Sequence, residues 1–173
     1  MVLTKDELIG RLDHEVHVLE HLLGKVKQAD LQYRPTPGQR SMRELLEYLA
    51  IFVPIHVRAI ATGHWDREKW GEEWRAEKAM ARTWSLEDIE EAISAQTSIF
   101  ADLRESLTDE DLRFEMEMFG RKTSRGEWLV WMVLSHYAAY RMQLFLYLKA
   151  CGREELGTLD LWAGVDSPVH AAV

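Results

Sequence analysis

The sequence contains one cysteine, Cys151, so it can form neither an internal disulfide nor a zinc site made of several cysteines. Glycine and proline are scarce, with ten and four in 173 residues, which excludes a collagen-like chain. No stretch approaches about 18 uninterrupted apolar residues, so no membrane-spanning helix is predicted. The first residues carry no apolar run behind a basic start, and no secretory signal is predicted. These absences lead us to expect a cytoplasmic protein.

Basic residues are also in short supply. The 21 lysines and arginines stand against 29 aspartates and glutamates, which gives a net charge of −8 at neutral pH. A nucleic acid or an anionic membrane surface needs a concentrated basic face, so we expect neither as a partner. The sequence has no G-x-S-x-G elbow, no glycine-rich phosphate loop and no H-E-x-x-H pair, which are common signatures of catalytic sites.

What the sequence does contain is helical patterning. Hydrophobic residues make up 47%, enough for a core, and the length predicts a single domain over 1–173 with an irregular tail from about residue 151. Four segments carry apolar residues at helical spacing, each behind a Ser or Thr that is followed three positions later by an acid. We therefore predict helices over 5–28, 42–61, 86–106 and 125–150, and expect the last to be the most buried because it is apolar almost all round.

The connections complete the predicted architecture. Residues 62–84 form a long connection between the second and third helices, with room for a short helix. Pro54 predicts a kink in the second helix, and FEMEMF at 114–119 is a candidate extended segment. The sequence thus predicts an all-α fold, an antiparallel four-helix bundle. The long connection carries bulky side chains that would either cap the end of the bundle or cover a pocket: Trp65, Trp70, Trp74 and Trp84.

Several polar and aromatic residues should face inward. Advancing each residue by about 100° around a helix places two sets on inward strips. A polar strip inside a bundle needs partners, either as a satisfied hydrogen-bond cluster or as the lining of a metal or substrate pocket. Both interpretations remain open for these residues, although His56 lies too far from Tyr48 for the two to share one ion. The candidate pocket residues are Tyr48, Phe52 and His56 from the second helix and Met132, His136, Tyr140, Gln143 and Tyr147 from the last.

Three further histidines lie on the first helix. His14, His17 and His21 are spaced by three and four residues, a spacing that allows two imidazoles to share a metal. The same angular count places them opposite the apolar stripe, so we expect them to face solvent or a subunit interface. An adventitious ion is the more plausible occupant of such a surface position.

Parts of the sequence resemble a known family. The segment YRPTPGQRSMRELLEYLA at 33–50, GRK at 120–122 before EWL at 127–129, and HYAAYRMQL at 136–144 are similar to the DinB/YfiT-like superfamily. The likeness runs in the right order from about residue 8 to 163. It implies a four-helix bundle, commonly a homodimer, and divalent-metal-dependent chemistry with zinc or nickel, as in thiol transferases or hydrolases. It also implies three histidine ligands, at the positions of Tyr48, His136 and Tyr140.

Only one of these three positions holds a histidine here, namely His136. Neutral imidazole binds zinc directly, whereas a phenol must first lose a proton whose pKa is about 10. We therefore expect the three-histidine site to be lost, no cofactor, and a bundle that binds a small molecule or serves as an interaction module. The alternative is a zinc- or nickel-dependent thiol transferase or hydrolase with a rebuilt ligand set around His136. A third hypothesis is metal-free acid–base catalysis by His136.

Overall fold

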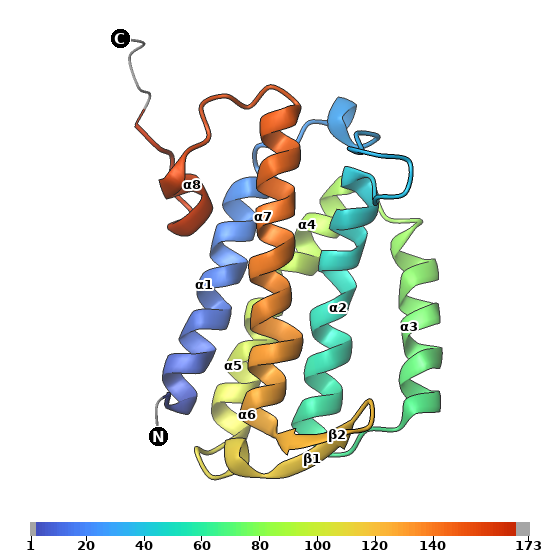
Figure 1. Ribbon diagram of the computed structural model, residues 1–173, viewed down its shortest axis with the longest axis vertical. Helices are drawn as coiled ribbons and strands as arrows, with labels where there is room; N and C mark the ends of the chain where they lie inside the picture. Colours follow the sequence, from blue (N-terminus) through green and yellow to red (C-terminus); the bar gives the residue numbers. More distant parts are fainter. Residues whose placement is uncertain (1–2, 169–173) are drawn as a thin grey trace.

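The computed structural model describes residues 3–168, and in them the fold is mostly helical. Figure 1 shows long helical segments lying side by side, in which the N-terminal helix and the last long helix run one way and the second helix runs the opposite way. The helices are α1 (Lys5–Leu23), α2 (Met42–Thr62), α3 (Arg67–Ala81), α4 (Leu86–Ser94), α5 (Gln96–Ser106), α6 (Arg125–Trp128), α7 (Ser135–Ala150) and α8 (Thr158–Trp162).

Short elements join these helices. Two 3₁₀ turns, η1 (Gln28–Asp30) and η2 (Asp111–Arg113), lie in connections, and a π-helical segment, η3 (Leu129–Leu134), links α6 to α7. Strands β1 (Glu115–Met118) and β2 (Arg121–Ser124) form an antiparallel hairpin, in which Met118 pairs with Arg121. The all-α prediction is therefore corrected by one small hairpin, which contains most of the predicted extended segment 114–119.

The predicted helix starts are confirmed. Thr4, Ser41 and Ser85 each accept a hydrogen bond from the backbone N–H three residues on, and the acid at that position bonds back to the cap. Ser124 accepts in the same way from the N–H of Glu127. These reciprocal bonds satisfy N–H groups that the first turn of a helix leaves free, which is why the pattern can be read from sequence.

The structure departs from the predicted elements at five places. The first helix ends at Leu23 rather than at 28, because Gly24 caps it. The third, 86–106, is two helices that meet at Ala95. The fourth, 125–150, contains the π segment, and the 62–84 connection holds the full helix α3 beside α2 (Figure 1). The tail from 151 is not wholly irregular, because α8 packs on α1 and α7.

The last long helix is also less buried than its composition predicts. Met142 is 38% exposed and Leu146 is 56% exposed, and both lie on the outer face of α7. The most buried long helix is α2, which contributes twelve buried residues. By length and composition α2 could cross a membrane, but 61% of its most apolar window is buried inside this fold. Its apolar side chains are thus accounted for by the protein core.

Gln96, which follows the break in the third predicted helix, lies against the turn of α2 that contains Pro54. A proline in a helix has no N–H, so the carbonyl four residues earlier, that of Ala50, loses its normal donor. The side chain of Gln96, which is fully buried, donates to the carbonyls of Leu49 and Ala50 at 3.0 and 3.2 Å. Its amide oxygen accepts from the hydroxyl of Tyr137 on α7. This side chain therefore links three helical segments.

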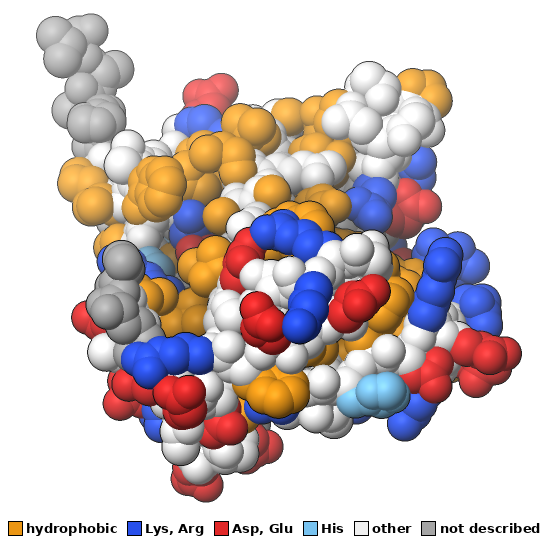
Figure 2. Space-filling view, turned by 60° about the horizontal axis from the view of Figure 1, so that its bottom comes forward, with side chains coloured by type: hydrophobic (Ala, Val, Ile, Leu, Met, Phe, Trp, Pro, Cys, Tyr) orange, Lys and Arg blue, Asp and Glu red, His pale blue; other side chains and the backbone are white. Residues whose placement is uncertain are grey.

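The hairpin closes one end of the helices. Phe119 and Gly120 form its two-residue turn, and both have positive φ, 51° and 76°. This is the turn geometry that fits the twist of a hairpin, although phenylalanine rarely adopts it. The ring of Phe119 packs on Trp65 and Trp70, with centroids 4.5 and 5.4 Å away. Figure 2 brings this end forward and shows hydrophobic side chains among charges of both signs.

Candidate functional site

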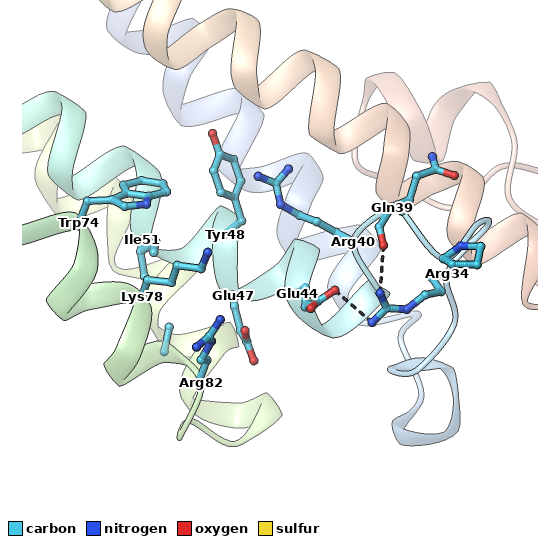
Figure 3. A pocket seen from close by; sticks show the side chains of 13 residues that line it. Arg34, Gln39, Arg40, Glu44, Glu47, Tyr48, Ile51, Trp74, Lys78 and Arg82 are labelled. Carbon is cyan, nitrogen blue, oxygen red and sulfur yellow. Dashed lines mark hydrogen bonds and ion pairs between the residues drawn. The ribbon is translucent and has the colours of Figure 1, made fainter. Parts of the chain in front are cut away.

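A cavity of about 290 Å³ lies between α2, α3 and the loop that precedes α2. Figure 3 shows its side chains coming from these three segments. The loop contributes one wall, the first turns of α2 the floor, and the last turns of α3 the opposite wall. The lining residues are Arg34, Pro37, Gly38, Gln39, Arg40, Glu44, Glu47, Tyr48, Ile51, Trp74, Lys78, Ala81 and Arg82.

The loop is fixed in place by the last long helix. The hydroxyl of Tyr147 donates to the backbone carbonyl of Arg40 at 2.9 Å, and the amide of Gln143 donates to the same hydroxyl at 2.5 Å. The ring of Tyr33 packs edge-on against Tyr147, with centroids 5.4 Å apart. Gln143 and Tyr147, which were predicted as pocket residues, therefore hold the loop and do not line the cavity.

Charge is distributed unevenly in the cavity. Both carboxylates are neutralised: Glu44 pairs with Arg34 at 3.2 Å, and Glu47 pairs with Arg43 at 2.6 Å. By contrast, three lining cations make no ion pair with any carboxylate among residues 3–168. These cations are Arg40, Lys78 and Arg82. The cavity is thus locally basic in a chain whose net charge is −8.

Arg40 lies against two tyrosine rings. Its guanidinium carbon is 4.3 Å from the centroid of the Tyr48 ring and 5.5 Å from that of Tyr140. One of its N–H groups donates to the hydroxyl of Tyr140 at 3.4 Å. A cation over a phenol ring is attracted by the negative face of the ring, which is a direct use for these two aromatic residues.

The phenol of Tyr48 stays protonated. Burial raises its pKa well above the usual range, the neighbouring Tyr140 raises it further, and Arg40 only partly opposes them. The rings of Tyr48 and Tyr140 are in contact, with centroids 4.8 Å apart. At neutral pH the phenol of Tyr48 is therefore a neutral group.

Behind Tyr48 the aromatic contacts continue along α2. Phe52 stacks on Tyr48 with centroids 5.4 Å apart, and His136 stacks on Phe52 at 5.5 Å. The ring centroid of His56, one turn further on, lies 6.2 Å from that of His136 and 5.7 Å from that of Trp70. The structure thus brings together five of the predicted pocket residues, Tyr48, Phe52, His56, His136 and Tyr140, although only Tyr48 lines the cavity.

His56 is a neutral, buried imidazole. Its Nδ1 lies 2.6 Å from the carbonyl oxygen of Phe52, so Nδ1 carries the proton and Nε2 is left as an acceptor. Burial lowers the pKa of His56 to about 4. The hydrogen bond to Phe52 raises the pKa and so opposes this effect, and the nearby His136 lowers it slightly further. The Nδ1 of His136 lies 3.3 Å from the carbonyl oxygen of Trp131, which belongs to η3.

The π segment also explains the position of Met132. A π-helix bonds i to i+5, so a uniform 100° count does not hold through it. Met132 is half-buried against the core and does not line the cavity.

The residues at the three implied ligand positions do not fit a divalent metal. One is a histidine, one is a protonated phenol, and the guanidinium of Arg40 already lies over the phenol rings. An ion there would meet a like charge and would find one neutral nitrogen donor. In the described part of the chain, three metal-binding side chains come within 4.8 Å of one another only at His21, Asp160 and Asp166.

Two histidines of α1, His14 and His21, are half-buried against the C-terminal segment, whereas His17 is exposed. His14 lies 2.7 Å from the carbonyl oxygen of Trp162, and His21 lies 2.7 Å from a carboxylate oxygen of Asp160. Gly164 packs closely on His17. The predicted exposure is therefore confirmed for His17 but not for His14 and His21, because the sequence carries no periodic signal that places α8 across this face of α1.

Sequence reasoning missed the three cations of the cavity. Arg40 looks like an ordinary loop residue next to a helix cap, and only its position over Tyr48 reveals its role. Lys78 and Arg82 did leave a signal, since they continue the four-residue spacing of Trp70 and Trp74. Extending the short helix to a C-cap at residue 82 would have placed these four residues on one face.

Comparison with known proteins agrees with this architecture. The family model described as the DinB superfamily matches residues 11–139. A crystal structure of a DinB-like protein from Bacillus subtilis superposes with a TM-score of 0.67 at 20% identity, covering 87% of this chain and 95% of that one. A DinB-like protein from Bacillus cereus gives 0.68 at 16%, covering 88% and 95%. A search of curated proteins found no significant match.

Proposed function

This chain belongs to the DinB superfamily, and from that premise we propose that its four antiparallel helices form a metal-free bundle that binds a small molecule. The observation that carries the proposal is the guanidinium of Arg40, 4.3 Å above the ring of Tyr48. The guanidinium thus lies beside two of the three positions at which the family resemblance implies metal ligands, Tyr48 and Tyr140. The cavity beside it has the concave, partly aromatic character of a ligand site.

Binding explains the site better than catalysis does. A covalent mechanism needs an activated nucleophile, and burial raises the pKa of the thiol of Cys151, which lies at the far end of α7 from η3. Acid–base catalysis by His136 would need a proton path to the cavity, but His136 does not line it. The contacts of the site are those of a rigid receptor: a loop held by Tyr147 and a wall held by stacked rings.

The competing proposal is a zinc- or nickel-dependent thiol transferase or hydrolase built around His136. One observation favours it, because the rings of His56 and His136 have centroids 6.2 Å apart and the Nε2 of His56 carries a free electron pair. A catalytic zinc site normally has three protein ligands. The pair is otherwise surrounded by the rings of Phe52, Trp70 and Trp74, which supply no metal ligand, and by the phenol of Tyr140, whose ring centroid lies 6.0 Å from that of His136.

Metal content separates the two proposals. We would measure zinc and nickel by mass spectrometry in untagged protein prepared without chelator, beside His136→Ala and the control His64→Ala, whose imidazole is exposed on the surface. We expect far less than one ion per chain in all three. About one ion per chain that is lost only in His136→Ala would overturn the metal-free proposal.

We also propose that the chain forms a homodimer through the outer face of α7. The exposed side chains of this helix carry no charge: Ser135, Ala138, Ala139, Met142, Leu146 and Ala150. Two copies with a net charge of −8 repel each other over most of their surfaces, and this face avoids that cost. Its small alanines allow close approach of two copies of the helix across a twofold axis.

A further inference from the structure

We infer that the ligand of the cavity is a small anion, a carboxylate or phosphate attached to a flat apolar body. This inference rests on the proposed function and adds the chemical class of the ligand. It comes from the three cations without ion pairs, Arg40, Lys78 and Arg82, which line a cavity next to the rings of Tyr48 and Trp74.

The cations are free to bind an anion because the carboxylates nearby are already engaged. Glu44 and Glu47 each pair with a different arginine, at 3.2 and 2.6 Å. Together with Arg34, these three cations give the cavity lining four positive charges against the two carboxylates, which is a surplus of two positive charges. In a protein of net charge −8 such a surplus is a local feature, and an anion entering the cavity would relieve it.

The cations approach from opposite walls. Arg40 extends from the loop over Tyr48, and Lys78 extends from α3 toward the same ring, as Figure 3 shows. Arg40 has five N–H donors and the described residues use one side-chain donor, toward Tyr140. Its remaining donors can therefore form the paired hydrogen bonds that arginine makes to carboxylate and phosphate oxygens.

The apolar part of the ligand would contact the aromatic and aliphatic side chains that lie between these cations. The rings of Tyr48 and Trp74 meet edge to face with centroids 5.6 Å apart, and the buried side chain of Ile51 lies on the floor. Rings in such an arrangement accept another flat ring against them. A cavity of about 290 Å³ is at the small end of ligand sites, so one ring with one anionic group matches its size.

The test compares three probes of nearly equal shape: benzoate, phenyl phosphate and neutral benzamide. Binding would be followed by NMR titration of the tryptophan indole signals and by calorimetry. We expect at least one anion to bind about tenfold more tightly than benzamide, since one charge-assisted hydrogen bond is worth about that factor. The ratio between benzoate and phenyl phosphate tells which anionic group the cavity prefers.

Three variants carry the charge argument. Arg40→Gln and Lys78→Gln should each weaken binding of the preferred anion about tenfold and weaken binding of benzamide by a smaller factor. Arg75→Gln is the matched control, because it removes the same charge from α3 at an exposed position outside the cavity. All three changes are at exposed side chains, and equal thermal unfolding midpoints would show that each variant folds.

Failures of the two proposals can be told apart. If benzamide binds as tightly as both anions, or if Arg75→Gln weakens the anion as much as Lys78→Gln, the anionic ligand class is overturned while a metal-free binding site stands. If no probe binds at millimolar concentration, the inference is overturned as well. A stoichiometric metal ion lost in His136→Ala would instead overturn the proposed function, whatever the probes do.

Discussion

Replacing Gln96 by leucine should destabilise the protein strongly, because this buried side chain satisfies groups on two other helices. Pro54 leaves the carbonyl of Ala50 without its helical donor, and Gln96 supplies one at 3.2 Å. The amide oxygen of Gln96 also accepts a hydrogen bond from the hydroxyl of Tyr137. Leucine would leave both the carbonyl and the hydroxyl buried and unpaired, at about 1–3 kcal/mol each. After the gain from the apolar side chain, we expect a net loss of about 3 kcal/mol in the free energy of unfolding.

Urea unfolding followed by tryptophan fluorescence and by circular dichroism would measure this loss. A lower midpoint with an unchanged slope would report stability alone. Gln28→Leu is the control, because the same change at an exposed position should stay within about 0.5 kcal/mol.

A double-mutant cycle with Pro54→Ala tests the cause. An alanine at 54 restores an N–H for the carbonyl of Ala50, so Gln96→Leu should cost about 1 kcal/mol less in that background. If Gln96→Leu alone costs under about 1 kcal/mol, or if the two changes are additive within about 0.3–0.5 kcal/mol, the assigned role of Gln96 is refuted.

Three further predictions follow from the same structure. The pKa of His56 is about 6.5 in the unfolded chain and about 4 in the folded protein, so the stability that depends on its neutral form is complete above pH 6.5 and is lost as pH falls toward 4. In urea melts at different pH values, His56→Gln should remove about 2–3 kcal/mol of this acid sensitivity. Asp160→Asn should weaken the contact of α8 with His21 by about 1–3 kcal/mol, seen as faster hydrogen exchange over 153–168 with unchanged exchange in α2. Leu146→Lys should convert a dimer to a monomer in light scattering, whereas Lys149→Gln should not.

Much of the fold was predictable from sequence because its signals are local. The caps at Thr4, Ser41, Ser85 and Ser124 are pairs three residues apart, and helix formation begins with such contacts. The long apolar stripe of α2 gave a helix that the structure places at the centre of the core.

The errors arise where distant contacts override local pattern. Nothing in residues 86–106 announces the break at Ala95, and the backbone partners of the adjacent Gln96 lie 46 and 47 positions earlier in the chain. The π segment before His136 changes the angular phase by contacts that sequence periodicity cannot show. The position of α8 over His14 and His21 is likewise set by pairing between residues more than a hundred positions apart.

The candidate site was predictable only in part, for a related reason. The inward direction of Tyr48 and Tyr140 follows from helical spacing, and the structure brings the two rings together. The partner that gives them a common role, Arg40, lies in a loop, where periodicity carries no information. Loop positions are set by anchors, here the bond from Tyr147 to the carbonyl of Arg40.

Arg40, Tyr48 and Tyr140 are best understood as one unit. A phenol has a larger π face than an imidazole and carries a hydroxyl. Arg40 uses both properties, since it lies over the ring of Tyr48 and donates to the hydroxyl of Tyr140. The two tyrosines and the arginine therefore make sense together, as a permanent protein cation beside a cavity that has a surplus of positive charge.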